Sequence, residues 1–381
     1  MITSLPSSPL PRSIIFIESD FKGAGNFIFF ILILNYIVDP YGIYKTNFFP
    51  YKLSQDKIIR LIKVVRVNDI KPSSIILGNS RAEVGFDPEH KYFEQPSYNL
   101  AVSGGTLYES LHYLEYAIKQ GNLKNVLLVA DWEMFNDIIK KTHDFDDYFD
   151  ESFYKYLFDI SVLKNSISTI FNKNHINPYL ENGLRYTDSS MVPENGHLFA
   201  SIKYEKADKN YLNVNNTYLG TQRSSFDDFK SILEICYKND INLEIIFGPM
   251  HIRYFETFDY YFGLETYYKW KKNLVLLADE ISKSHNRKPF KIIDFSVYHY
   301  FTSEMVPLKP EIAMQYYWES SHYKKELGDI VLDRLLDISP YKDFGIELNS
   351  QNIDNHIKKL RDDREKYIDI KKYRQEVFGE N

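Results

Sequence analysis

The sequence predicts an α/β protein, a three-layer sandwich in which helices cover both faces of a mainly parallel sheet. Two observations carry this prediction. Short apolar runs that end in turn residues are typical of buried strands, and amphipathic stretches follow most of them. Strands that alternate with helices in this way form parallel sheets. With 381 residues, the chain is long enough for one large domain with appendages, or for two domains.

The composition excludes several classes of protein. Hydrophobic residues make up 44% and charged residues 26%, so the chain is neither disordered nor collagen-like. A net charge of −6 leaves no basic excess to neutralise a phosphate backbone, so we expect no nucleic-acid partner. Cys236 is the single cysteine, which rules out an intramolecular disulfide and a cysteine metal cluster. The aromatic content of 16% fits large packing surfaces or carbohydrate stacking.

The N-terminal region contains an apolar segment, FIFFILILNYIV, at residues 27–38. With the small residues before it, the uncharged stretch covers 23–38, which is shorter than the roughly 20 residues that span a bilayer. The turn at 39–42 is a poor cleavage site for a signal peptide. We therefore expect residues 1–44 to carry an uncleaved single-pass anchor. The alternative is a buried strand or helix of the globular domain.

The main domain, which we place at residues 45–340, begins with alternating helices and strands. Residues 53–70 have apolar side chains at helical spacing, with Lys and Arg between them. Thr106 and Glu109 have the spacing of a capping box at the start of the next helix. We predict strands at 73–80, 98–104 and 125–131, and helices at 53–70 and 106–120.

Residues 132–222 interrupt this alternation. They are rich in Phe, Tyr, Asp and Asn and contain loop signals, so we predict a partly helical insertion. The alternation then resumes. Residues 341–381 are a charged C-terminal tail, which we expect to form a solvated surface helix. After the insertion we predict helices at 224–239, 262–284 and 322–336, and strands at 241–249 and 291–297.

Candidate site residues stand at the carboxyl ends of the strands, where open α/β sheets form their sites. Ser80 follows the first strand, where its hydroxyl can act as a nucleophile and the turn can supply an oxyanion donor. A helix N-cap is the alternative role for Ser80. Gly104 and Gly105 end the second strand, where glycines either let a backbone N–H approach an oxyanion or form a plain turn.

A histidine and a carboxylate precede the last predicted helix. Glu319 lies three residues before His322, which is close enough to accept a bond from the imidazole and fix its tautomer. Helix capping is the alternative role for this segment. The sequence has no His-x-x-x-His pair, no Walker A motif and no Gly-x-Gly-x-x-Gly after the first strand. We therefore expect no metal and no nucleotide cofactor.

Two further strand ends carry polar residues. Asp131 ends the third strand, where it can orient a substrate hydroxyl or cap a helix. His251 follows the strand at 241–249, where it can bind substrate or a metal, or make a structural hydrogen bond. We group Asp131 and His251 with Asn79 and Arg81, which flank Ser80, as candidate substrate-binding residues.

Together these motifs resemble the SGNH/GDSL hydrolase superfamily, and most nearly its membrane-anchored cell-envelope branch of alginate O-acetylation and DltD-like proteins. The resemblance implies a flavodoxin-like sandwich. It also implies Ser80 as nucleophile, His322 as base and Glu319 as the residue that orients the base. The amides of Ser80 and of Gly104 or Gly105 would form the oxyanion hole. The motifs are ILGNSR (76–81), NLAVSGG (99–105) and WESSHY (318–323) followed by Leu327-Gly328, within residues 72–132 and 241–336.

The chain departs from the family pattern at three places. Glu319 stands where the family has aspartate, and Asn79 stands where the family has aspartate before the nucleophile. The third family block, Gly-x-Asn-Asp, is replaced by ADWEMFND at 130–137. Asn136 lies too far along that segment to be assigned to the block.

The resemblance implies acyl transfer at an ester, without a metal or organic cofactor. We expect a serine O-acyltransferase or acetylesterase of the bacterial inner membrane, anchored by one helix, with its catalytic domain outside the cytoplasm. Its partners would be an envelope polysaccharide or an acyl donor protein. Two alternatives stay open. One is a catalytically inactive SGNH-like module that binds polysaccharide or an acyltransferase partner. The other is a cytosolic α/β protein whose apolar N-terminus is core.

Overall fold

The computed structural model describes most of the chain, in two compact units. One unit consists of Met1–Ile58 and Asp146–Asn177, and the other of Ile59–Phe145 and Pro178–Asn381. The described residues are 26–135, 145, 149, 154–174, 177–188, 191–207 and 223–380.

The larger unit is built on a six-stranded sheet with the order β2-β1-β3-β4-β5-β6. The first five strands run parallel, and β6 runs antiparallel to β5. The prediction of an α/β protein with a mainly parallel sheet is therefore confirmed. The strands are β1 (Ser74–Leu77), β2 (Ser97–Asn99), β3 (Asn125–Val129), β4 (Asn242–Phe247), β5 (Lys291–Asp294) and β6 (Ile346–Leu348).

The central strands are apolar because the sheet is covered by helices. Every residue of β1, SIIL, is buried, as expected for a parallel strand with both faces covered. Ile76 of β1 pairs with Asn99 of β2 and with Leu127 of β3. This register aligns the carboxyl ends of β1 and β2, so the segments that follow these two strands meet at one edge of the sheet.

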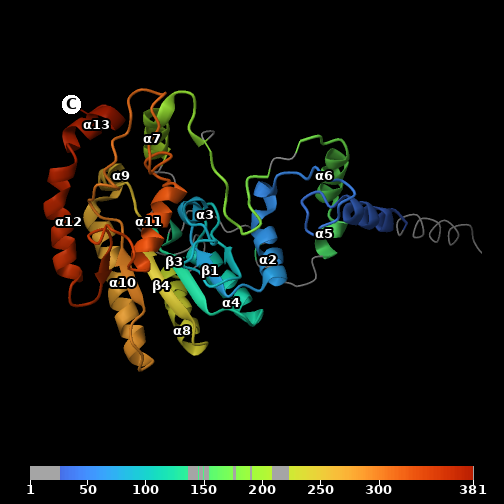
Figure 1. The fold of residues 1–381 in the computed structure, drawn as a ribbon, viewed down its shortest axis with the longest axis horizontal. Coiled ribbons are helices and arrows are strands. Elements are labelled where there is room, and N and C mark those ends of the chain that lie inside the picture. Colours follow the sequence, from blue (N-terminus) through green and yellow to red (C-terminus); the bar gives the residue numbers. More distant parts are fainter. Residues whose placement is uncertain are drawn as a thin grey trace, which may run out of the picture. The chain divides into compact units, whose positions relative to one another are not determined.

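The helices pack against the sheet and against one another, and their arrangement can be followed in Figure 1. Helix α4 packs beside α8 and α8 beside α10, whereas α3 packs beside α11. The predicted capping box of Thr106 and Glu109 at the start of α4 is confirmed. The helices of this unit are α2 (Ile59–Ile70), α3 (Ser80–Gly85), α4 (Leu107–Lys119), η2 (Trp132–Phe135), α7 (Gly196–Ala207), α8 (Ser225–Lys238), α9 (Ile252–Phe262), α10 (Leu264–Ser284), α11 (Lys325–Leu335), α12 (Ile353–Tyr367) and α13 (Ile370–Phe378).

The charged C-terminal tail belongs to the larger unit. It supplies β6 to the sheet, α12 packs against α10, and α13 packs against α7 and α9. Sparse apolar residues at helical spacing, Ile353, Ile357 and Leu360, are buried on α12. On the charged side of the same helix, Arg364 donates to both oxygens of the buried Glu256 of α9. The tail is therefore a packed, amphipathic part of the fold.

The smaller unit joins the N-terminal segment to part of the predicted insertion. Residues 26–38 are helical, and the unit also contains η1 (Gln55–Ile58), α5 (Tyr154–Phe158) and α6 (Ile160–Ile170). The Asn35 amide donates to the Leu157 carbonyl (2.9 Å) and accepts a bond from the Ser166 hydroxyl (2.8 Å). Segments more than 100 residues apart in sequence are therefore held together by a buried asparagine.

The N-terminal helix exposes large apolar side chains. Phe27, Phe29 and Phe30 are 56%, 62% and 57% exposed. In the part of the chain that the structure describes, no helix has the length and apolar character needed to cross a membrane. Residues 23–25, the start of the expected anchor, lie outside the described residues.

Candidate active site

A very close approach of two helices brings distant parts of the chain together. Gly328 of α11 lies against Gly85 of α3, and a Cβ added to Gly328 would stand 1.7 Å from the Gly85 carbonyl oxygen. The ring of Tyr323 fills the space in which a Cβ of Gly85 would stand. Glycine is required at both positions for this contact. As a result, the segment before α11 reaches the start of α3, where Ser80 lies.

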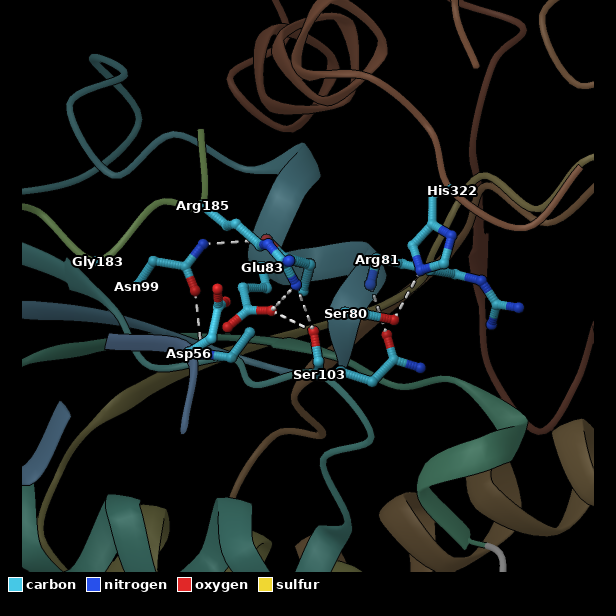
Figure 2. A network of polar contacts seen from close by, with 12 residues as sticks. Asp56, Ser80, Arg81, Glu83, Asn99, Ser103, Gly183, Arg185 and His322 are labelled. Carbon is cyan, nitrogen blue, oxygen red and sulfur yellow. Dashed lines mark hydrogen bonds and ion pairs between the residues drawn. The ribbon is translucent and has the colours of Figure 1, made fainter. Parts of the chain in front are cut away.

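Ser80, His322 and Glu319 form one hydrogen-bonded chain. The Ser80 Oγ lies 2.8 Å from His322 Nε2, and these two side chains face each other in Figure 2. On the other side of the imidazole, His322 Nδ1 is hydrogen-bonded to Glu319 Oε1. With the proton on Nδ1, Nε2 can accept the proton of the serine hydroxyl. The structure thus brings together the three residues that the sequence singles out as a triad.

Burial and a backbone bond fix the glutamate. Glu319 is 1% exposed and His322 is 9% exposed. The second carboxylate oxygen of Glu319 accepts the Ser321 N–H at 2.6 Å. The predicted last helix begins only at Lys325, so His322 lies in the loop before it. Glutamate therefore reaches the imidazole within a tight loop, despite being longer than aspartate.

The residue before the nucleophile caps helix α3. Asn79 is the N-cap, and its Oδ1 accepts the Arg81 N–H at 3.0 Å. The capping role considered for Ser80 is therefore wrong, because Ser80 is the first residue of the helix. A helix leaves its first N–H groups without partners inside the helix. The Ser80 N–H is accordingly available as an oxyanion donor beside its own hydroxyl.

The two predicted glycines have different roles. The Gly105 N–H donates to the Val102 carbonyl at 2.8 Å, which closes a turn after β2. A Cβ at Gly105 would lie 2.9 Å from the Gly78 carbonyl oxygen, so the turn is packed closely on the end of β1. Since the Gly105 N–H is used within the turn, Gly104 is the better oxyanion donor. Gly104 lines the same cavity as Ser80.

Arg81 is buried and clamps three segments together. Its Nε donates to the Ser321 carbonyl at 2.7 Å, and its two terminal nitrogens donate to the Glu133 carboxylate at 2.6 Å each. The guanidinium also stacks on the Tyr254 ring, 4.6 Å from its centroid. Arg81 was expected to bind substrate, but its donors are committed to the protein. It ties α3 to η2 and to the loop that carries His322.

Burial acts to raise the pKa of both acids near Arg81, but the net direction of the shift differs between them. Burial raises the pKa of the Asp131 carboxyl, against the opposing effect of the Arg81 charge 3.6 Å away. Burial also acts to raise the pKa of Glu133, but the Arg81 charge and the hydrogen bonds from Arg81 and Tyr254 outweigh it, so this pKa is lowered. Glu133 is therefore the anionic partner of the clamp. No pattern in the sequence around Glu133 predicts this role, because its partner Arg81 lies 52 residues earlier.

His251 lies at the start of helix α9, where both ring nitrogens are used. Its Nδ1 accepts the Arg253 N–H at 3.2 Å, and its Nε2 donates to the Glu304 carbonyl at 2.8 Å. Burial lowers the pKa of His251 to about 4. These contacts make His251 a neutral helix cap rather than a ligand for substrate or metal. Among the described residues, no group of His, Cys, Asp and Glu could hold a metal ion.

A cavity of about 360 Å³ opens onto the nucleophile. Helix α7, from the predicted insertion, supplies part of its wall. The ring of Tyr204 lies edge-on to the His322 ring, with 5.5 Å between the centroids. The sequence does not predict that α7 forms this wall, because the helix has no clear apolar stripe. The cavity is lined by Asn79, Ser80, Arg81, Gly104, Gly105, Glu133, Lys203, Tyr204, Ala207 and Ser321.

Two hydrogen bonds hold α7 against the loop that carries His322. The Ser320 N–H donates to the Ser201 hydroxyl at 3.1 Å, and His197 Nδ1 donates to the Trp318 carbonyl at 2.9 Å. Helix α7 is therefore part of the site.

Asn136, which could not be assigned to the third family block, lies outside the described residues.

Neither a scan against protein-family models nor a search of curated proteins found a match to the chain. The geometry itself indicates a chemistry: a serine hydroxyl, a histidine that can take its proton, a buried carboxylate and two candidate backbone donors around a cavity. This arrangement is typical of nucleophilic acyl transfer.

Proposed function

We propose that this protein is a serine-dependent esterase or O-acyltransferase of the SGNH type. The observation that carries the proposal is the chain of hydrogen bonds from Ser80 through His322 to Glu319, at the mouth of a cavity. The order of these contacts is that of a nucleophile, a general base and an orienting carboxylate. The proposal needs no metal and no cofactor.

The reaction has two balanced halves. The Ser80 oxygen attacks the carbonyl carbon of an ester while its proton passes to His322 Nε2. The carbonyl electron pair moves onto the carbonyl oxygen, which gives a tetrahedral intermediate with an oxyanion. The Ser80 and Gly104 N–H groups stabilise this oxyanion. Collapse of this intermediate expels the alcohol, which takes the proton from His322, and leaves an acyl-serine. Water or an acceptor hydroxyl then attacks the acyl group by the same route in reverse. Water gives an esterase, and an acceptor sugar gives a transferase.

The proposed substrate is a polysaccharide of the cell envelope, and the proposed location is the bacterial inner membrane. Two features support these assignments. An exposed tyrosine, Tyr204, offers an aromatic face beside the catalytic histidine, as is common where sugars bind. The N-terminal helix exposes Phe27, Phe29 and Phe30, which suits contact with a bilayer. In this proposal the catalytic unit lies outside the cytoplasm, and an acyl donor protein supplies the acyl group for transfer.

One observation favours a second candidate, an inactive module that binds polysaccharide or an acyltransferase partner. Family members use a third block to supply a side-chain amide to the oxyanion hole. Among the described residues that line the cavity, Asn79 is the one side-chain amide; its oxygen caps α3, and its side chain also hydrogen-bonds to the Asp131 carboxyl. A weak oxyanion hole would not stabilise the transition state of acyl transfer, and the cavity would then bind a ligand without catalysing a reaction.

Covalent labelling of Ser80 separates the two candidates. Full-length protein in detergent is treated with a fluorophosphonate probe and, separately, with p-nitrophenyl acetate. We expect Ser80→Ala to abolish labelling and to lower turnover by at least about a thousandfold, because it removes the nucleophile. Folding should be unchanged, since Ser80 is only half-buried at the start of a short helix.

Ser74→Ala is the matched control. Ser74 is a buried serine at the opposite end of β1, and its hydroxyl donates to the Glu94 carbonyl at 2.8 Å. It should keep both labelling and turnover. Turnover that persists in Ser80→Ala would rule out the proposed mechanism, and a folded wild type that is neither labelled nor active would favour the binding module.

A further inference from the structure

A tight turn after β2 presents the Gly104 N–H. The bond from the Gly105 N–H to the Val102 carbonyl closes this turn over residues 102–105. Gly104 has a φ of +65°, the left-handed conformation that the third residue of a type II turn needs. The central peptide of such a turn, here between Ser103 and Gly104, can be flipped to give a type I turn. Something must therefore hold this peptide in one orientation.

Arg60 holds the carbonyl of that central peptide. Its Nη2 donates to the Ser103 oxygen at 3.1 Å, and its Nε donates to Glu109 Oε1 at 2.6 Å. Glu109 is itself fixed, because it takes part in the capping box with Thr106. The C=O and N–H of a planar trans peptide point in opposite directions. The bond from Arg60 therefore decides where the Gly104 N–H points.

A second set of contacts holds the Ser103 side chain. Its hydroxyl donates to Glu83 Oε2 at 2.6 Å and accepts a bond from Arg185 Nη1 at 3.2 Å, as Figure 2 shows. Glu83 is fully buried in α3, the helix that begins at Ser80, and pairs with the buried Lys63 ammonium at 3.6 Å. The turn is thus tied to the helix that carries the nucleophile.

We propose that Arg60 is a positioning residue of the oxyanion hole. By holding the Ser103–Gly104 peptide, it directs the Gly104 N–H into the cavity that Ser80 shares. The inference rests on the proposed function, since the N–H has an oxyanion to stabilise only in an acyl-transfer site. Arg60 contacts the carbonyl side of the Ser103–Gly104 peptide, whereas the reacting atoms would lie on its N–H side. Its loss should therefore weaken transition-state binding and leave substrate binding intact.

The test compares Arg60→Met with the wild type in the full-length protein. The measurements are kcat and KM for p-nitrophenyl acetate, and the inhibition constant of a boronic acid that forms a tetrahedral adduct on Ser80. We expect kcat to fall about 100-fold, the usual effect of losing one oxyanion donor. KM should stay within about twofold, and the boronic acid should bind more weakly by about the same factor as kcat falls.

Three more variants make the test specific. Arg60→Lys can still donate to the Ser103 carbonyl and should keep kcat within about tenfold of the wild type. Arg66→Met is the matched control, because Arg66 lies on the same helix and pairs with Asp69 at 3.4 Å. It should leave kcat and the boronic acid affinity unchanged. Arg60→Leu, which also lacks a hydrogen-bond donor, is measured in the same way, so that the test stands if Arg60→Met does not fold.

The outcomes separate this inference from the proposed function. An active wild type together with unchanged kcat in a folded Arg60→Met or Arg60→Leu variant overturns the inference alone. A fall in kcat without weaker boronic acid binding also overturns it, because the loss is then not in the oxyanion hole. A folded wild type that is neither labelled nor active overturns both.

Discussion

At the scale of single residues, His251 shows how burial turns a titratable group into a structural one. Its pKa is lowered from 6.5 to about 4 because the ring is buried and must stay neutral to cap α9. In the unfolded chain the ring binds a proton as the pH falls below its ordinary pKa. The unfolded state therefore binds more protons between these values, and stability is lost as the pH falls through that window.

We predict that His251 alone lowers the free energy of unfolding by about 3 kcal/mol between pH 7 and pH 4. His251→Asn keeps a capping side chain but removes the titration, so its unfolding free energy should depend less steeply on pH. The measurement is urea unfolding at several pH values. His285→Asn, at an exposed histidine, is the control and should keep the wild-type slope. Equal slopes for His251→Asn and the wild type would contradict the prediction.

The sequence was most informative where the chemistry needs a fixed spacing within a short segment. Ser80 at a strand end, and Glu319 three residues before His322, could be singled out in this way. The role of Arg81 could not, because its partner Glu133 is 52 residues away and the pairing depends on tertiary packing. Tyr204 was missed for the same reason, since it reaches the histidine only through the docking of α7.

At the scale of secondary-structure elements, the contact between α3 and α11 assembles the triad. The Gly328 position allows no side chain, because a Cβ there would stand 1.7 Å from a backbone oxygen of α3. We predict that Gly328→Ala forces the helices apart, lowers the free energy of unfolding by about 2 kcal/mol or more, and reduces kcat more than KM changes. Chemical unfolding and turnover of p-nitrophenyl acetate measure the two effects.

A neighbouring surface residue supplies the control for this contact. Asp329 follows Gly328 on α11 and pairs with Lys325 at 2.8 Å near the surface. Asp329→Ala should change stability by less than about 1 kcal/mol and leave turnover intact. If Gly328→Ala behaves like this control, the close approach of the helices is not what sets the distance between Ser80 and His322.

Strands and helices were predictable to different degrees. The apolar runs of β1, β3 and β4 stand out because parallel strands bury both faces. Helix α12 was harder to predict as part of the core, since its few buried residues, Ile353, Ile357 and Leu360, are dispersed among charges. Its burial is provided by α10, which lies about 80 residues earlier in the chain. Local patterns cannot show such a partner.

At the scale of the whole molecule, the C-terminal tail completes the larger unit. Removing residues 341–381 would expose the edge of β5, which pairs with β6, and the face of α10 that α12 covers. It would also leave the buried carboxylate of Glu256 without Arg364. Uncompensated buried charge and an open sheet edge both favour unfolding and aggregation.

We therefore predict that a chain ending at residue 340 does not form a stable monomer. Circular dichroism and analytical ultracentrifugation, with the full-length protein alongside, would show reduced structure or large aggregates. A truncated chain that stays monomeric, folded and active would mean that the tail is an appendage and that its packing contributes little.

The distance in sequence between the proposed nucleophile and its proposed base has a consequence for when the proposed activity can begin. Ser80 and His322 are separated by 242 positions. At about 5–20 residues per second, a ribosome adds the histidine on the order of 10 to 50 s after the serine. During that interval the growing chain holds a serine with no base to activate it. In the proposed function, ester hydrolysis begins only after His322 has been synthesised and its loop has packed against α3, so turnover reports that these parts of the larger unit have folded.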